Sequence, residues 1–296
     1  MKALVTGALG VVGRALLADR PDGVDIELLL DPETQQLAGY AWYRSDITEY
    51  EKTEMAVDCS DADWVIHCAG MADMDKCERE SERAFRVNAR GAGNIARASR
   101  NAGANMAMIS TDQVFDGLSG PYGEDDRPDP VNTYGRSKLE GERTAAAEAG
   151  HLLILRIGCP FGKRFEGTAH TFLSGVVSRV GTGEEVPVPD DQLTTPAYLK
   201  ECANVLWILV ERNASGVYHY GTCDRLSLWD MAHRTCGMLG YDTSLVKRVK
   251  TRDLKLPAKR PLQGGFVTEK IHDVLARPPI SFDEAILRMI ETRELP

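Results

Sequence analysis

The sequence predicts an α/β protein with a doubly wound parallel sheet and a smaller part at its C-terminal end. Three observations support this fold class. Short apolar runs alternate with amphipathic helical patterns in the first half of the chain, a glycine-rich turn joins the first run to the first helix, and the alternation becomes irregular after about residue 160. Strands that alternate with helices are typical of parallel sheets covered on both faces.

The apolar runs and the helical patterns follow one another in a regular order. Strands are expected at 2–6, 26–30, 64–68, 105–110 and 152–157. Helices are expected between them, at 11–19, 49–58, 78–102 and 134–149. This order implies right-handed crossovers between neighbouring parallel strands. Residues 1–160 are therefore predicted to form a dinucleotide-binding domain of the Rossmann type.

The second part of the chain, 161–296, has a less regular pattern. Glycine and proline punctuate it at 158–167, 181–189 and 257–265. Helical patterns reappear at 197–212, 227–239 and 281–292. We expect this part to bind mainly the substrate, with some of its segments returning to the Rossmann core.

Composition favours a soluble cytoplasmic enzyme. The chain has 296 residues and a net charge of −9, which argues against binding to nucleic acid or to anionic membranes. No apolar stretch approaches the ~20 residues of a membrane span. The seven cysteines are odd in number and form no C-x-x-C pair, so they are expected to be reduced thiols. No cluster of ligating side chains indicates a metal site.

The glycine-rich turn is the first functional motif. Gly7, Gly10 and Gly13 are spaced G-x-x-G-x-x-G between the first strand and the first helix. Glycines at such a turn let the backbone approach a pyrophosphate at the helix N-terminus. Asp31 ends the second strand, where a carboxylate accepts hydrogen bonds from both ribose hydroxyls and so favours NADH over NADPH. Arg14 is a possible phosphate contact that would favour NADPH instead.

A tyrosine and a lysine form the second motif. Tyr134 and Lys138 are four residues apart in a helical pattern, so they lie on one face of the helix. A nearby ammonium favours the phenolate, and we therefore expect Lys138 to lower the pKa of Tyr134. A tyrosine of lowered pKa is an effective proton donor near neutral pH. Tyrosine and lysine at this spacing are also common on helix surfaces, so the pair gains weight only from its context.

Several longer stretches resemble the extended short-chain dehydrogenase/reductases, and within them the dTDP-4-dehydrorhamnose reductase family. They include TGALGVVG (6–13), FRVNARGAGNIARA (85–98), ISTDQVFDG (109–117), PVNTYGRSKLEGE (130–142) and the Lys259-Arg260-Pro261 turn. The resemblance runs nearly from end to end of the chain.

The resemblance implies roles for particular residues. The catalytic residues would be Thr111, Tyr134, Lys138 and Asn88. A cofactor, NADH or NADPH, would contact Gly7, Gly10, Val11, Val12, Gly13, Asp31, Asp46, Ile47, Ala69, Gly70, Met71, Ser110, Tyr134 and Lys138. The substrate would contact Thr111, Asp112, Gln113, Cys159 and Arg260. Structural explanations stay open for three of these: Thr111 as a turn cap, Asn88 as a packing amide and Asp46 as a helix cap.

Two positions depart from the family pattern. Gln113 stands where related sugar-nucleotide dehydratases carry a glutamate and where the reductases usually carry a tyrosine. An amide cannot act as a general acid or base, which counts against elimination chemistry. Cys159 stands where the reductases carry a tryptophan, so we expect a sugar pocket of different shape.

The resemblance implies an NAD(P)-dependent oxidoreductase that acts on CH–OH groups. The expected reaction is reduction of the 4-keto group of a nucleotide-linked 6-deoxy sugar, as in dTDP-rhamnose biosynthesis, by a possible homodimer. Two alternatives remain. One is a catalytically silent dinucleotide-binding protein like the regulatory β subunit of methionine adenosyltransferase, and the other is a reductase of a different ketone.

Overall fold

A parallel sheet forms the centre of the molecule. We describe residues 1–294 of a computed structural model. Seven strands are hydrogen-bonded in the order β10-β6-β5-β4-β1-β2-β3, every pair of them parallel, which confirms the predicted doubly wound sheet. These strands are β1 (Lys2–Thr6), β2 (Asp25–Leu30), β3 (Ala41–Arg44), β4 (Trp64–His67), β5 (Asn105–Thr111), β6 (Leu152–Phe161) and β10 (Gly216–Tyr220).

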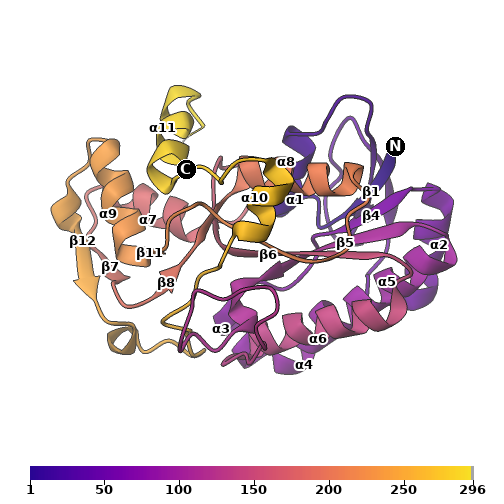
Figure 1. The fold of residues 1–296 in the computed structure, drawn as a ribbon, viewed down its shortest axis with the longest axis horizontal. Coiled ribbons are helices and arrows are strands. Elements are labelled where there is room, and N and C mark those ends of the chain that lie inside the picture. Colours follow the sequence, from indigo (N-terminus) through magenta and orange to yellow (C-terminus); the bar gives the residue numbers. More distant parts are fainter. Residues whose placement is uncertain (295–296) are drawn as a thin grey trace.

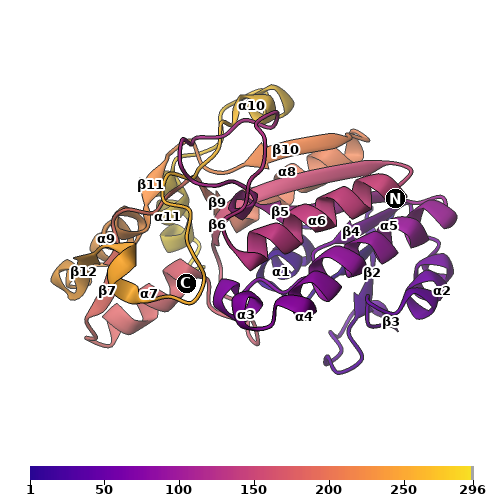
Figure 2. The ribbon, with the colours of Figure 1, turned by 90° about the horizontal axis from the view of Figure 1, so that it is seen from below.

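Helices cover both faces of this sheet (Figures 1 and 2). One face is covered by α1 (Val11–Ala18), α8 (Leu199–Glu211) and α10 (Glu269–Leu275). The other is covered by α2 (Tyr50–Ser60), α5 (Gly91–Asn101) and α6 (Thr133–Glu148). Side chains of β1 alternate between the two: Ala3 and Val5 join the core beneath α1 and α8, whereas Leu4 joins the core beneath α5.

The predicted helix at 78–102 is a chain of shorter pieces. These are α3 (Met74–Arg79), α4 (Ser81–Phe85), a π-helical turn at Arg86–Arg90 and α5. The chain bends at Glu80, whose φ of −118° and ψ of 50° are not helical. The π turn carries Asn88, which is 1% exposed. Single π turns inside longer helices are frequent at functional sites.

The C-terminal part builds a second, smaller core at the left of Figure 1. It contains α7 (Phe172–Gly181), α9 (Leu228–Met238), α11 (Phe282–Glu291), β7 (Val186–Pro189) and β12 (Val246–Val249). Two short strands, β8 (Leu193–Thr194) and β11 (Leu226–Ser227), pair with each other. By contrast β9 (Pro196–Tyr198), α8, β10 and α10 return to the central sheet and its helices. The division at residue 160 remains a prediction.

The sequence-based prediction missed the short strands β7, β8, β9, β11 and β12 of the C-terminal part and four further elements, β3, β10, α7 and α10. Strand β3 lies at the edge of the sheet and is mostly exposed, so it has no apolar run. Strand β10 contains the buried polar residue His219, which interrupts the apolar pattern by which a buried strand is predicted from sequence. Helices α7 and α10 lie in the region of irregular periodicity. No helix within residues 1–294 is long and apolar enough to cross a membrane.

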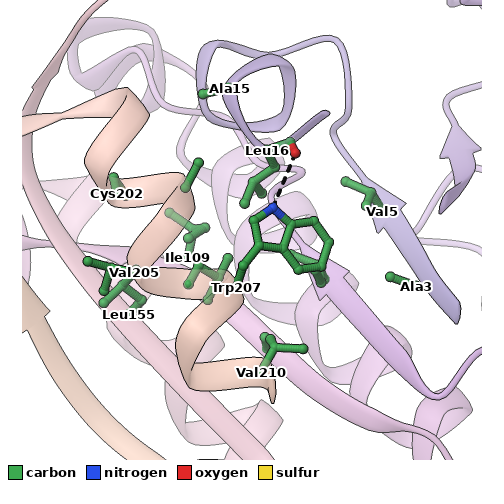
Figure 3. Packing of buried hydrophobic residues seen from close by; sticks show 14 of the residues in the cluster. Ala3, Val5, Ala15, Leu16, Ile109, Leu155, Cys202, Val205, Trp207 and Val210 are labelled. Atoms are coloured by element: carbon green, nitrogen blue, oxygen red, sulfur yellow. Dashed lines mark hydrogen bonds between the residues drawn. The ribbon is translucent and has the colours of Figure 1, made fainter. Parts of the chain in front are cut away.

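Trp207 fastens α8 to α1, and we expect its loss to destabilise the fold. Its side chain is 1% exposed, and its indole N–H donates to the carbonyl of Leu16, 3.2 Å away (Figure 3). This carbonyl lies in the last turn of α1, where carbonyls lack helical partners. Trp207→Ala should lower the free energy of unfolding by about 3–5 kcal/mol, because it leaves a cavity. Trp207→Phe, which keeps most of the packing, should cost about 1–2 kcal/mol.

Chemical denaturation of the two variants tests this. An alanine variant no less stable than the phenylalanine variant would show that α8 packs on α1 without depending on this indole.

Candidate active site

A cleft of about 740 Å³ opens at the carboxyl ends of β1, β2 and β4. Open α/β sheets bind ligands at this edge. Eight of the residues predicted to contact a cofactor line it: Gly7, Gly10, Asp31, Asp46, Ile47, Ala69, Gly70 and Met71. Val11, Val12, Gly13, Ser110, Tyr134 and Lys138 are not among the lining residues of the described chain, and their contact with a cofactor remains a prediction.

The glycine turn is packed too tightly for side chains. Gly7 has a φ of +65°, and a Cβ atom built on it would lie 2.4 Å from the backbone nitrogen of Ala69. A Cβ atom on Gly13 would lie 2.4 Å from the carbonyl oxygen of Gly7. Gly13 therefore lets α1 approach the turn, although it does not face the cleft itself. The turn leaves a bare backbone surface at the N-terminus of α1, which suits an anion.

Arg44, which the sequence reasoning missed, holds the loop that carries Asp31. Its guanidinium donates to the carbonyls of Asp31, Pro32 and Thr34 at 3.3, 2.6 and 3.0 Å. The carboxylate of Asp31 accepts from the backbone N–H of Glu33 at 3.1 Å. These contacts fix the carboxylate at the rim of the cleft. No local pattern indicates them, since Arg44 ends a strand that was itself not predicted.

Asp46 and Ile47 follow β3, the strand that pairs with β2, and also line the cleft. The carboxylate of Asp46 accepts from the N–H of Thr48 at 2.8 Å, so it also stabilises the turn that leads into α2. Ile47 is held by Asn94, whose amide donates to its carbonyl at 2.9 Å. Both residues line the cleft, so the capping role and the predicted cofactor contact are compatible.

Asn88 connects the cleft to the helix that carries Tyr134. Its amide nitrogen donates to the carbonyl of Met71 and to the hydroxyl of Ser137, both at 2.9 Å. Its amide oxygen accepts from the N–H of Met71 at 2.7 Å. Ser137 in turn donates to the carbonyl of Tyr134 at 2.8 Å. Asn88 therefore positions one wall of the cleft against α6.

Thr111 and Tyr134 come together beside this connection. Thr111 ends β5, and Tyr134 lies in the first turn of α6, which Asn132 caps by accepting from the N–H of Gly135 at 2.8 Å. Burial raises the pKa of Tyr134 above its ordinary value, and a hydrogen bond with the hydroxyl of Thr111 partly offsets this. The negative charge of Asp112 raises the pKa of Tyr134 further. At neutral pH Tyr134 therefore keeps its proton.

The expectation that Lys138 lowers the pKa of Tyr134 is wrong for this structure. The ammonium of Lys138 donates to the carbonyl of Ile109 at 2.7 Å. Its charge does not shift the pKa of Tyr134. Burial lowers the pKa of Lys138 itself to about 8, against the opposing effects of Glu142 and Cys68. Cys68 lines the cleft, so Lys138 lies between the cleft and the core.

Ser110 faces the protein interior. Its hydroxyl donates to Glu142, which also accepts from the Nε and Nη2 atoms of Arg156 at 2.9 and 2.6 Å. The side chains of Glu142 and Arg156 are only 6% and 5% exposed. Only the backbone of Ser110 is thus left for the predicted cofactor contact. His67 is buried as well, and its Nδ1 lies 2.8 Å from the hydroxyl of Thr6.

The hydroxyl of Thr111 donates to the carboxylate of Asp112 at 3.3 Å and accepts from the N–H of Gln113 at 3.2 Å. Burial raises the pKa of Asp112, whose carboxylate accepts from Gln113 at 3.1 Å and from Thr194 at 2.9 Å. Burial and the charge of Asp112 raise the pKa of Cys159 to about 12. A thiol of such high pKa is a poor nucleophile at neutral pH.

With this geometry established, comparison with known proteins identifies the family. The sequence model of the family described as "RmlD substrate binding domain" matches residues 1–294. The chain belongs to the dTDP-4-dehydrorhamnose reductase family. This confirms the resemblance inferred from the motifs.

Relatives and solved structures agree with this family. A probable low-salt glycan biosynthesis reductase of Haloferax volcanii is 31% identical over 97% of this chain and 97% of its own. A dTDP-4-dehydrorhamnose reductase of Mycolicibacterium smegmatis is 31% identical over 88% of this chain and 76% of its own. The β subunit of methionine adenosyltransferase 2 of Danio rerio is 29% identical over 80% of this chain and 72% of its own.

Two crystal structures from the family superpose over nearly the whole chain. A dTDP-4-dehydrorhamnose reductase of Clostridium acetobutylicum has a TM-score of 0.88 and 27% identity, with all of both chains covered. One from Bacillus anthracis, in complex with NADP, has a TM-score of 0.84 and 26% identity, covering 98% of this chain and 99% of its own. Its ligand supports the prediction of a nicotinamide dinucleotide cofactor.

The Arg-Pro turn of the reductase family is fastened to α3 here. Arg260 is paired with Asp75 at 3.0 Å, and its side chain is 10% exposed. The carboxylate of Asp75 also accepts from the N–H of Ala258 at 3.1 Å. On its other side, the turn is held by Asn132, which donates to the carbonyl of Lys259 at 2.9 Å. The charge of Arg260 is thus already balanced, and its predicted contact with a substrate remains a prediction.

We expect Asp75→Asn to destabilise the protein, because it leaves a mostly buried guanidinium without its counter-charge. The free energy of unfolding should fall by about 2 kcal/mol, less than for a fully buried pair. Glu80→Gln is the matched control, because Glu80 pairs with Arg83 on the surface at 3.1 Å and should cost under about 0.5 kcal/mol. Equal losses in urea denaturation would show that the Asp75–Arg260 pair contributes no more than a surface pair.

Proposed function

We propose that this protein is an NAD(P)H-dependent reductase of the short-chain dehydrogenase/reductase class that converts the 4-keto group of a nucleotide-linked 6-deoxy sugar into an alcohol. The observation that carries the proposal is the placement of Thr111 at the carboxyl end of β5 and of Tyr134 in the first turn of α6, which Asn88 links to a dinucleotide-type cleft. Family membership supports a sugar-nucleotide keto reductase, and the named reductases among its relatives support the dTDP-linked substrate.

The cleft residues fit a nicotinamide dinucleotide. The bare glycine turn would hold its pyrophosphate, and Asp31 would accept from the ribose hydroxyls. Asp46 and Ile47 would contact the adenine. When bound, the reduced nicotinamide supplies the hydride.

Tyr134 is the proton donor of the proposed reaction. Because burial raises its pKa, it holds its proton at neutral pH and is able to give it to the carbonyl oxygen of the substrate. The hydroxyl of Thr111, which donates to Asp112 at 3.3 Å in this structure, would turn to donate a second hydrogen bond to the same oxygen. Lys138, protonated below pH about 8, would contact the ribose next to the nicotinamide. Asn88 positions the first turn of α6, which carries Tyr134, through Ser137.

The substrate pocket differs from the family pattern at two places. Gln113 donates to Asp112 and accepts from Asn132, and an amide at this position does not replace the glutamate that the dehydratases carry beside their aspartate. Cys159, at a φ of +31°, offers less apolar surface than a tryptophan. These differences support a sugar of different shape or a different ketone, with the same chemistry at the carbonyl.

A silent dinucleotide-binding subunit is the second candidate. The similarity to the β subunit of methionine adenosyltransferase 2 favours it, and so do the changes at Gln113 and Cys159. The presence of Thr111, Tyr134 and Lys138 favours the enzyme, because a purely regulatory protein does not need these three.

Tyr134→Phe tests the reductase. It removes the donated proton but keeps the ring, so kcat should fall by about 10²–10⁴-fold while the affinity for NADH and NADPH stays nearly constant. Turnover is followed by the decrease in nicotinamide absorbance across a panel of 4-keto nucleotide sugars. Dinucleotide binding is followed separately by titration calorimetry.

The two measurements separate the candidates. A wild-type protein that binds the dinucleotide but reduces no member of the panel would favour the silent subunit. A phenylalanine variant with wild-type turnover would remove Tyr134 from the role of acid.

The pH dependence of the reaction should report Lys138. With a pKa of about 8, lowered by burial, the ammonium is present below that pH and lost above it, whereas Tyr134 keeps its proton through this range. We expect kcat/KM, which reports the free enzyme, to fall as the pH rises through about 8. In Lys138→Arg the guanidinium stays charged throughout this pH range, so the fall of kcat/KM above pH about 8 should vanish. The value of kcat/KM itself should be lower, because arginine does not reproduce the contacts of lysine. An unchanged fall in this variant would assign it to another group.

A further inference from the structure

Three cations line one wall of the cleft and have no role in the function proposed above. They are Lys76 of α3, Arg83 of α4 and Arg86 of the π turn, which we call the basic rim. Within residues 1–294 they are the only lysine or arginine side chains that line the cleft. The two lining carboxylates, Asp31 and Asp46, come from segments after β2 and β3 instead.

Arg14, which the sequence suggests as a phosphate contact, and Arg44, at the end of β3, are both engaged elsewhere. The guanidinium of Arg14 lies over the ring of Phe165, 5.4 Å from its centre. Arg44 donates all three of its hydrogen bonds to the loop at 31–34. Neither residue lines the cleft. Positive charge for an anionic ligand therefore has to come from the basic rim.

The charges of the basic rim are available to a ligand. Lys76 and Arg86 form no ion pair within residues 1–294. Arg83 pairs only with Glu80, at 3.1 Å, and this pair is 55% and 39% exposed. Exposed pairs of this kind contribute little free energy, so a phosphate is able to replace Glu80 at small cost. Arg83 and Arg86 are three residues apart and lie on one helical face.

We propose that the basic rim binds phosphate groups of the dinucleotide, opposite the glycine turn and the two carboxylates. The inference rests on the dinucleotide-binding part of the proposed function. The cleft presents hydrogen-bond acceptors on one side and cations on the other, so its ligand must carry hydroxyl or amino groups together with anions. Guanidinium groups bind phosphate oxygens in pairs of charge-assisted hydrogen bonds. In a chain of net charge −9, this cluster also attracts the anion locally.

The test measures dissociation constants of NADH and NADPH for Arg83→Gln/Arg86→Gln and for Lys76→Gln, at low and at moderate salt. We expect the affinity to fall about tenfold for each cation that binds a phosphate and is replaced, and its dependence on salt to weaken. Arg79→Gln/Arg90→Gln is the matched control, because it removes the same charge from exposed residues of α3 and the π turn that do not line the cleft.

The two cofactors identify the phosphate. Equal losses of affinity for NADH and NADPH assign the rim to the pyrophosphate, and a loss confined to NADPH assigns it to the 2′-phosphate. Wild-type affinity in the rim variants, or an equal loss in the control, would overturn the inference while leaving the proposed function intact. A wild-type protein that binds neither dinucleotide would overturn both.

Discussion

The side-chain amide of Asn88 is the group on which the site depends. It binds both backbone polar groups of Met71 in the cleft and the hydroxyl of Ser137 in α6. Because Ser137 lies between Tyr134 and Lys138, one amide sets how far the catalytic helix stands from the cleft wall. The π turn makes this possible, since its extra residue brings Asn88 into the interior. Gly141 lets α6 approach this turn, because a Cβ there would lie 2.3 Å from the Asn88 carbonyl.

Burial determines the charge state of the residues around this amide. It raises the pKa of Tyr134, Asp112 and Cys159, and it lowers the pKa of Lys138. In each case the shift favours the neutral form. Glu142 forms an ion pair with Arg156 through two hydrogen bonds. The carboxylate of Glu142 opposes the loss of the proton from Lys138.

The sequence predicted those features whose signal is local. The glycine turn, the ends of β2 and β5, and the Tyr134–Lys138 spacing each lie within one short segment, and the sheet follows from their order. The long-range contacts carried no such signal. Asp75 and Arg260 are far apart in sequence and pair only when the chain is folded. Arg44 carried no local signal either, because its strand lacks an apolar run. Nor did the bend at Glu80 that divides the expected helix.

The raised pKa of Tyr134 is the opposite of the lowered pKa that its spacing from Lys138 suggests. A tyrosine of raised pKa keeps its proton at neutral pH, so Tyr134 would enter the reaction as the acid, and it gives its proton only to a base stronger than its own phenolate. An alkoxide that forms in such a low-dielectric site is strongly destabilised until it is protonated, so transfer from Tyr134 becomes favourable as the charge appears. The arrangement therefore supplies the proton that reduction of a carbonyl needs, whereas the ratio of reduced to oxidised dinucleotide sets the net direction of the reaction.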